Sequence, residues 1–262
     1  ILGDMKSGKR MQRLLQGDVG SGKTVVAFLA SLATIEAGAQ ATLMAPTDVL
    51  ARQHGRTRQA LGERVGIRVA VLTGRDKGKA REAILTRLGA GEIDLLIGTH
   101  ALFQNSVTFK DLALIIVDEQ HRFGVDQRMA LASKGLAPHM LSMTATPIPR
   151  TLMLTAYGDM DHIAIPEKPP GRQPIQTTVT PLGRIQEVID GIGRAMARGE
   201  RVYWICPLVE ESELSDLAAA EDRAESLRAY FGETVVLAHG QMKAQDRDAA
   251  MARFASGEAK LL

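Results

Sequence analysis

One glycine-rich segment of the sequence has the spacing of a phosphate-binding loop. Residues 17–24 read GDVGSGKT and match the pattern G-x-x-x-x-G-K-S/T. Glycines let backbone N–H groups turn toward phosphate oxygens, and the helix that follows directs its positive end at them. Lys23 adds a charge near the β- and γ-phosphates, and Thr24 offers a hydroxyl to Mg²⁺. We therefore predict that ATP is bound by Gly17, Asp18, Val19, Gly20, Ser21, Gly22, Lys23 and Thr24.

A pair of acidic residues farther along the chain has the chemistry that completes such a site. Asp118 and Glu119 follow the apolar run LALIIV, and ligands of an open parallel sheet bind at the carboxyl ends of its strands. Asp118 is expected to hold Mg²⁺. Glu119 is expected to orient and deprotonate the attacking water, because phosphoryl transfer needs little beyond positioning and charge stabilisation.

These residues must be positioned by alternating strands and helices. Amphipathic helical stretches at 25–38, 48–63 and 77–92 separate short apolar runs, which predicts an α/β fold with a parallel sheet and crossover helices. The expected strands are 13–16, 41–45, 67–73, 93–99, 112–118 and 140–145.

A proline-rich segment divides the chain. PEKPPGRQP at 166–174 forbids a continuing helix or a central strand, so we expect a first lobe at 1–166, a linker at 167–174 and a second, incomplete α/β lobe at 175–262. Expected strands of the second lobe are 175–180, 201–207 and 234–240, and expected helices are 183–198, 213–231 and 243–255. Trp204 and Cys206 are interpreted as core residues of the second of these strands.

Composition restricts the possible partners and compartments. With 32 basic and 30 acidic residues the net charge is only +2, so any nucleic-acid footprint must be local. The single cysteine cannot form an internal disulfide, and no apolar run is long enough to span a membrane. We expect a cytoplasmic protein without a structural metal. Because the chain starts without Met and stops as a new strand would begin, we expect both ends to be internal to a longer protein.

Motifs along the chain resemble those of helicase superfamily 2, DExH type. APTDVLARQH at 45–54 resembles motif Ia, LTG at 72–74 and GTHALF at 98–103 resemble the Ib region, TATPIPRT at 144–151 resembles motif III, and VYWICP at 202–207 resembles motif IV. The resemblance implies two RecA-like lobes, the second truncated, in which ATP hydrolysis drives movement on duplex DNA.

A narrower resemblance is to the RecG family of bacterial branch-migration helicases. The strings that carry it are GDVGSGKT, DEQHRFGV, TATPIPRTL, YGDMD, PPGR, CPLVEES and HGQMK. It implies action on stalled forks and branched DNA with little sequence specificity, a monomer, and a single-strand-binding protein as a further partner. The alternatives are an Mfd-like translocase, a P-loop ATPase acting on another substrate, and an inactive DNA-binding scaffold.

The resemblance implies further site residues. Polar groups after the strand ends can bind the DNA backbone, or can be ordinary loop and cap groups: Thr47, Gln53, His54, Thr73, Gly74, Thr99 and His100. His239 faces DNA in the same reading, or is a turn residue. His121 joins the catalytic group by coupling the ATP site to Thr144 and Thr146. The basic helix face with Arg52, Arg56 and Arg58 is interpreted as solvated.

The resemblance also implies motifs that this sequence does not contain. Arginines that reach the γ-phosphate belong to a motif expected after Leu262, an adenine-recognising segment is expected before Ile1, and strand separation requires a wedge domain. We therefore expect these 262 residues alone to bind nucleotide weakly and to hydrolyse it slowly.

Overall fold

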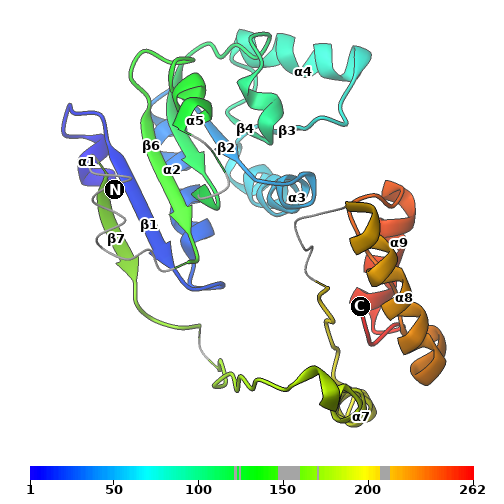
Figure 1. Cartoon of the computed structure of the whole chain (residues 1–262). Helices are drawn as coiled ribbons and strands as arrows, with labels where there is room; N and C mark the ends of the chain where they lie inside the picture. Colours follow the sequence, from blue (N-terminus) through cyan, green and yellow to red (C-terminus); the bar gives the residue numbers. More distant parts are fainter. Residues whose placement is uncertain (121–122, 124, 147–159, 170, 207–212) are drawn as a thin grey trace. The chain divides into compact units, whose positions relative to one another are not determined.

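The computed structural model describes residues 1–120, 123, 125–146, 160–169, 171–206 and 213–262. The chain divides into two compact units, Ile1–Gln173 and Pro174–Leu262, and Figure 1 shows the elements of each. The boundary between the units falls inside the proline-rich segment.

The first unit is built on a seven-stranded sheet in the order β3-β4-β2-β5-β6-β1-β7, and every pairing is parallel. The predicted α/β fold class is confirmed, and the six predicted strands all form. The strands are β1 (Gln12–Gly17), β2 (Gln40–Met44), β3 (Val69–Leu72), β4 (Leu95–Gly98), β5 (Leu112–Val117), β6 (His139–Thr144) and β7 (Asp161–Ile165).

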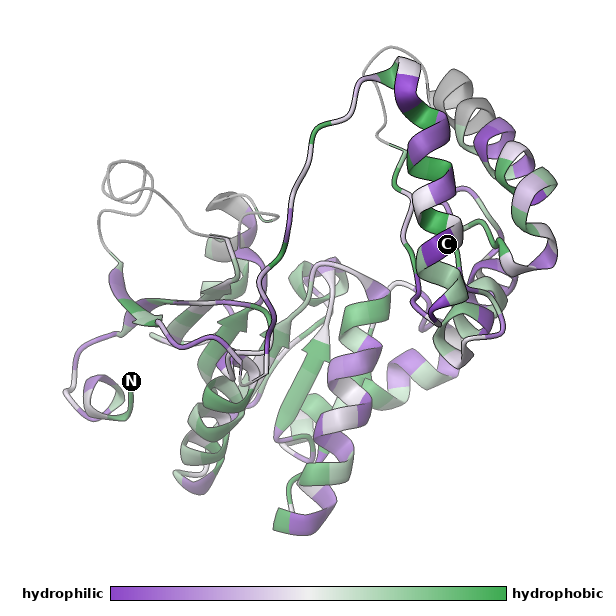
Figure 2. Cartoon of the chain, turned by 90° about the horizontal axis from the view of Figure 1, so that it is seen from below, coloured by the Kyte–Doolittle hydropathy of each residue, from purple (hydrophilic) through white to green (hydrophobic). Residues whose placement is uncertain are grey.

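Helices cover both faces of this sheet. On one face α2 and α3 pack against alternate strand residues such as Leu43 and Ile116, and on the other α4, η1 and α5 pack against Met44 and Ile115. Their bounds are α1 (Leu2–Met5), α2 (Lys23–Glu36), α3 (Asp48–Val65), α4 (Gly78–Ala90), η1 (His100–Phe103) and α5 (Val125–Ala132). Figure 2 shows the strands of the sheet as hydrophobic, whereas the helices carry hydrophilic residues as well. Because both faces are buried, the central strands read as continuous apolar runs.

Strand β7 was not expected from the sequence. It pairs with β1 at the edge of the sheet, where Arg13 lies opposite Asp161 and Gly17 opposite Ile165. Four of its five residues are exposed, so it has no buried apolar run by which it could be recognised.

The second unit has the predicted helices but not the predicted strands. The helices are η3 (Leu182–Arg184), α7 (Ile185–Ala197), α8 (Glu213–Phe231), η4 (Gly232–Thr234) and α9 (Ala244–Ser256). Leu261 makes isolated parallel bridges with Val202 and Val235, and residues 175–180 form no strand.

Candidate nucleotide-binding site

The glycine-rich loop joins the end of β1 to the start of α2. Gly20 and Gly22 have φ values of +83° and +97°, which is the left-handed region that glycine enters without steric penalty. A Cβ atom on Gly17 would lie 2.5 Å from Ser21 Oγ, so the loop closes tightly only because this residue has no side chain. Gly22 is the N-cap residue of α2. The free N–H groups of the first helical turn are thereby presented at the loop, as phosphate binding requires.

Lys23 is placed inside this loop. Its ammonium group donates hydrogen bonds to the carbonyl oxygens of Gly17 (2.7 Å) and Asp18 (2.9 Å), and the residue is only 9% exposed. The hydroxyl of Ser21 is buried and has no hydrogen-bond partner among the described residues. A buried cation and an unpaired hydroxyl in a glycine cradle are groups that an anionic phosphate would satisfy.

The two acidic residues follow β5 directly. Asp118 Oδ1 accepts a hydrogen bond from the backbone N–H of Glu119 (3.1 Å), and Asp118 Oδ2 lies 2.9 Å from His54 Nε2. Glu119 has φ +49°, a left-handed conformation that costs a non-glycine residue about 1–2 kcal/mol. Strained backbone of this kind concentrates at functional sites, which agrees with the catalytic role predicted for Glu119.

Strand register brings the loop and the acidic pair to one edge of the sheet. On β6, Thr144 lies opposite Gln16 of β1, and Ser142 lies opposite Val117 of β5. The strand that ends in Thr144 therefore stands between the phosphate loop and Asp118. The hydroxyl oxygens of Thr144 and Thr146 are 2.8 Å apart, so the two predicted coupling residues contact each other beside the site. His121 lies outside the described residues.

The donor set suits magnesium. Mg²⁺ bound with a nucleotide keeps several waters and takes one or two protein ligands besides the phosphates, and Thr24 with Asp118 supplies that number. No cluster of three or more His, Cys, Asp or Glu side chains that could hold a metal occurs in the described part of the chain.

One residue that sequence reasoning misinterpreted is Arg58. It was assigned to a solvated basic face, but it is 1% exposed, and it lies 2.8 Å from His54 Nδ1 and 3.4 Å from the Thr24 carbonyl oxygen. Burial lowers the pKa of Arg58 to about 10, opposed by the charge of Asp118. The signal in the sequence was the spacing: Arg58 follows His54 by four residues, on the α3 face that carries Ala51 and Gly55.

Arg172 is a second residue missed from the sequence. It belongs to the proline-rich segment, and its guanidinium lies 2.7 Å from an Asp18 carboxylate oxygen and donates to the Val19 carbonyl. The pKa of Asp18 is lowered by the Val19 N–H bond first and then by Arg172. A Cβ atom on Gly20 would lie 3.1 Å from Pro169. The segment that leaves the first unit therefore packs on the phosphate loop.

The residues predicted to contact DNA separate into exposed and inward-facing groups. Thr47, Gln53, Gly74 and His100 are exposed after the ends of β2, β3 and β4. Thr73 and Thr99 are buried, and Thr73 is hydrogen-bonded to Asp76. His54 is turned inward between Arg58 and Asp118. Thr99 Oγ1 is buried and has no hydrogen-bond partner among the described residues. Because these three side chains are buried or partly buried, contact with a DNA backbone through them stays a prediction.

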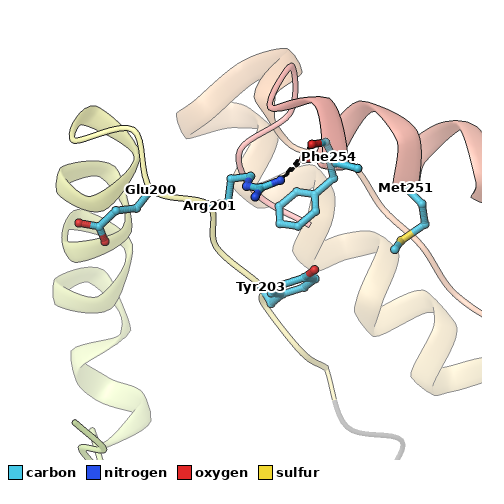
Figure 3. Close-up of a pocket in the computed structure, with 6 residues that line it drawn as sticks. Glu200, Arg201, Tyr203, Met251 and Phe254 are labelled. Carbon is cyan, nitrogen blue, oxygen red and sulfur yellow. Dashed lines mark hydrogen bonds between the residues drawn. The ribbon is translucent and has the colours of Figure 1, made fainter. Parts of the chain in front are cut away.

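The remaining predicted residues lie in the second unit. His239 Nε2 lies 3.7 Å from Glu221 Oε1. Trp204 is partly buried and packs against the Ile189 cluster, whereas Cys206 is exposed, which corrects its assignment to the core. A hollow of about 580 Å³ is lined by Tyr203 and Phe254 among others, whose ring centroids lie 4.7 Å apart with the planes tilted by 59°; Figure 3 shows the residues that line it. None of the predicted site residues lines it.

Comparison with known proteins agrees with this geometry. The family described as "DEAD/DEAH box helicase" matches residues 3–155, which include the glycine-rich loop and both acidic residues. The chain belongs to the DEAD/DEAH box helicase family. Membership of this family implies nucleotide use.

Individual relatives point to one branch of this helicase family. The chain is 49% identical over 99% of its length to the ATP-dependent DNA helicase RecG of Escherichia coli K12, and 47% identical over its whole length to RecG of Bacillus subtilis. It spans 38% and 39% of those relatives. A solved structure of RecG bound to a three-way DNA junction superposes with a TM-score of 0.76 at 41% identity, covering 99% of this chain and 34% of that one.

A more distant protein shows the same fold. Dbp5 of Saccharomyces cerevisiae, in a structure bound to RNA and ADP BeF3, has a TM-score of 0.64 at 15% identity, over 96% of this chain and 65% of that one.

In the described part of the chain, no helix has both the length and the apolar character needed to cross a bilayer.

Proposed function

We propose that this chain is the motor region of an ATP-dependent DNA helicase that remodels branched DNA. The observation that carries the proposal is the convergence of the phosphate loop and the acidic pair, on either side of Thr144, at one edge of a parallel sheet. The similarity to RecG over nearly the whole chain supports DNA as the partner and branched structures as the substrate.

The nucleotide would be held by the loop and by Lys23. When phosphates enter, the Lys23 ammonium exchanges the carbonyl oxygens of Gly17 and Asp18 for phosphate oxygens. A charged acceptor makes these bonds about twice as strong as neutral ones. Thr24 and Asp118 would hold Mg²⁺, which supplies positive charge to the β- and γ-phosphate oxygens when it is bound.

Hydrolysis would then need one further group, a base for water. As the water oxygen bonds to the γ-phosphorus, the bond from that phosphorus to the β–γ bridging oxygen breaks and ADP leaves with the electron pair. Glu119 accepts the proton that the water loses. The backbone of Glu119, two residues after the end of β5, positions this carboxylate.

Exposed groups after β2, β3 and β4 would supply the DNA contacts. Thr47, Gln53, Gly74 and His100 are exposed and carry hydrogen-bond donors, and we expect them to contact the DNA backbone with little sequence specificity. Monomeric action and contact with a single-strand-binding protein stay predictions from the family resemblance.

The test is the ATPase rate of the protein in its full natural length with linear duplex, single-stranded DNA and a model fork. We expect DNA to stimulate turnover, the fork to stimulate it most, and Glu119→Gln to bind ATP but lose turnover at least a hundredfold, as is common when a general base is removed (on the order of 10²–10⁴). Equal ATPase rates with all three DNAs would contradict the assignment of branched DNA as the substrate, but not the assignment of this chain to an ATP-driven motor. A rate that no DNA changes would favour a P-loop ATPase acting on another substrate.

A further inference from the structure

Three polar side chains form a hydrogen-bonded chain that leads from helix α3 to the acidic pair; Arg58 is buried, and His54 and Asp118 are partly buried. Arg58 Nη1 lies 2.8 Å from His54 Nδ1, and His54 Nε2 lies 2.9 Å from Asp118 Oδ2. An arginine guanidinium only donates hydrogen bonds, so Nδ1 of His54 must accept from Arg58. The His54 proton is therefore on Nε2 and is donated to Asp118. Arg58 fixes both the tautomer and the direction of the bond.

The same guanidinium reaches the other half of the site. Arg58 Nη2 donates to the carbonyl oxygen of Thr24 at 3.4 Å, in the first turn of α2. Arg58 thus contacts the phosphate-loop helix directly and the acid Asp118 through His54. Both residues expected to hold Mg²⁺ have a backbone or side-chain group in this hydrogen-bonded chain.

Packing alone does not explain a buried arginine at this position. Arg58 is among the largest fully buried side chains of the protein, and its Nε has no hydrogen-bond partner among the described residues. Burial of a charge is unfavourable unless it is paired, and apolar residues of similar volume are often at least as stabilising. The polar contacts of Arg58 are therefore what distinguishes it from an apolar residue of the same size.

We propose that His54 is a positioning residue for Asp118, held in its donating tautomer by Arg58, and that this chain sets the orientation of the carboxylate that receives the metal–nucleotide complex. The inference rests on the proposed function of Asp118. Partners behind a metal ligand commonly change metal affinity by about 10- to 100-fold when they are removed. We expect a change of that size in the affinity for Mn²⁺–ADP.

Two substitutions of His54 that differ in side-chain length distinguish hydrogen-bond donation to Asp118 from the effect of side-chain shape. In His54→Gln the amide nitrogen can occupy the position of Nε2 and donate to Asp118, so Mn²⁺–ADP affinity should stay within about threefold of wild type. In His54→Asn the amide is too short to reach Asp118, so affinity should fall about 10- to 100-fold. Gln59→Leu changes an exposed residue of the same helix and should have no effect.

Mn²⁺ bound with ADP to the full-length protein is titrated by electron paramagnetic resonance, with thermal unfolding of each variant measured in parallel. Weak binding by the Asn variant together with near-normal binding by the Gln variant supports the proposal. Equal affinities in the two variants, whether normal or weakened, overturn it. No binding of Mn²⁺–ADP by the wild-type protein overturns the proposed function, and this inference with it.

A second readout does not depend on the metal. Selective ¹⁵N labelling of histidine reports which ring nitrogen of His54 carries the proton, and comparison with His54→Gln assigns its signals. We expect a protonated Nε2 and an unprotonated Nδ1, and loss of that preference in Arg58→Met. The opposite tautomer, or a doubly protonated ring, overturns the proposal even if metal binding is normal.

Discussion

The hydrogen bonds of the Gln40 side chain are expected to contribute strongly to the stability of the first unit. Its side-chain amide donates to the carbonyl oxygens of Leu88 (3.0 Å) and Ile93 (2.7 Å), and its Oε1 accepts from the backbone N–H groups of Lys110 (2.7 Å) and Asp111 (3.0 Å). The residue is buried and stands where the pairing of β2 with β5 shifts register. One side chain thus joins the end of α4 and the segments before β4 and β5 to the start of β2.

Replacing Gln40 with leucine should lower the free energy of unfolding by about 3 kcal/mol. Four hydrogen bonds of about 1 kcal/mol each are lost, but Leu88 keeps a second partner in the N–H of Gly91. Lys110 and Asp111 are exposed, so water can reach their N–H groups. The Ile93 carbonyl oxygen has no such replacement, because Ile93 is fully buried.

Native-state hydrogen exchange of the β2 and β5 amides is the suitable measurement, because it reports on the first unit separately from the second. Gln59→Leu, an exposed change on α3, is the control and should stay within about 0.5 kcal/mol of wild type. Nucleotide affinity should not change in either variant, because Gln40 begins β2 and the site lies at the other end of the strands. A loss below about 1 kcal/mol for Gln40→Leu would refute this account of the four bonds.

Three further outcomes are expected. Lys23→Ala should weaken ATP binding by about 10- to 100-fold, measured by nucleotide titration, because a charged hydrogen bond contributes about 1.5–3 kcal/mol; unchanged affinity would remove Lys23 from the site. Gly98→Ala should destabilise the first unit by about 1–3 kcal/mol in urea unfolding. A Cβ atom at this position would overlap the Leu72 carbonyl oxygen and lie 2.9 Å from the Leu102 side chain. The control is Gly3→Ala, which should leave stability unchanged because an added Cβ there has no atom within contact distance. Burial lowers the pKa of His139 below 6.5, and its Nδ1 accepts from the Met11 N–H. The folded state therefore binds this proton less readily than the unfolded state, and stability should fall as pH drops below 6.5 toward the folded-state pKa. His139→Asn should reduce the fall in the thermal midpoint between about pH 7.5 and 5.5, and an unchanged slope would contradict the assignment.

The sequence by itself determined the chemical groups and the strands that carry them. The glycine spacing with Lys23 and Thr24 specifies the backbone of the phosphate-binding loop locally, so the loop could be predicted without knowledge of its tertiary contacts. The buried strands were also predictable, because a parallel sheet covered on both faces needs apolar residues in nearly every position. Asp118 and Glu119 were recognised because two acids after such a run cannot remain in the core.

Only the tertiary structure decided which elements lie side by side. It placed β6 between β1 and β5, and so brought Thr144 beside the phosphate loop and the acids. It buried Arg58, Thr73 and Thr99, which look like surface polar groups in the sequence. It also folded Arg172 onto Asp18 across a long sequence separation. These contacts join residues far apart in the chain or on the inner face of a helix, and local patterns of residue type do not specify which distant groups will meet there.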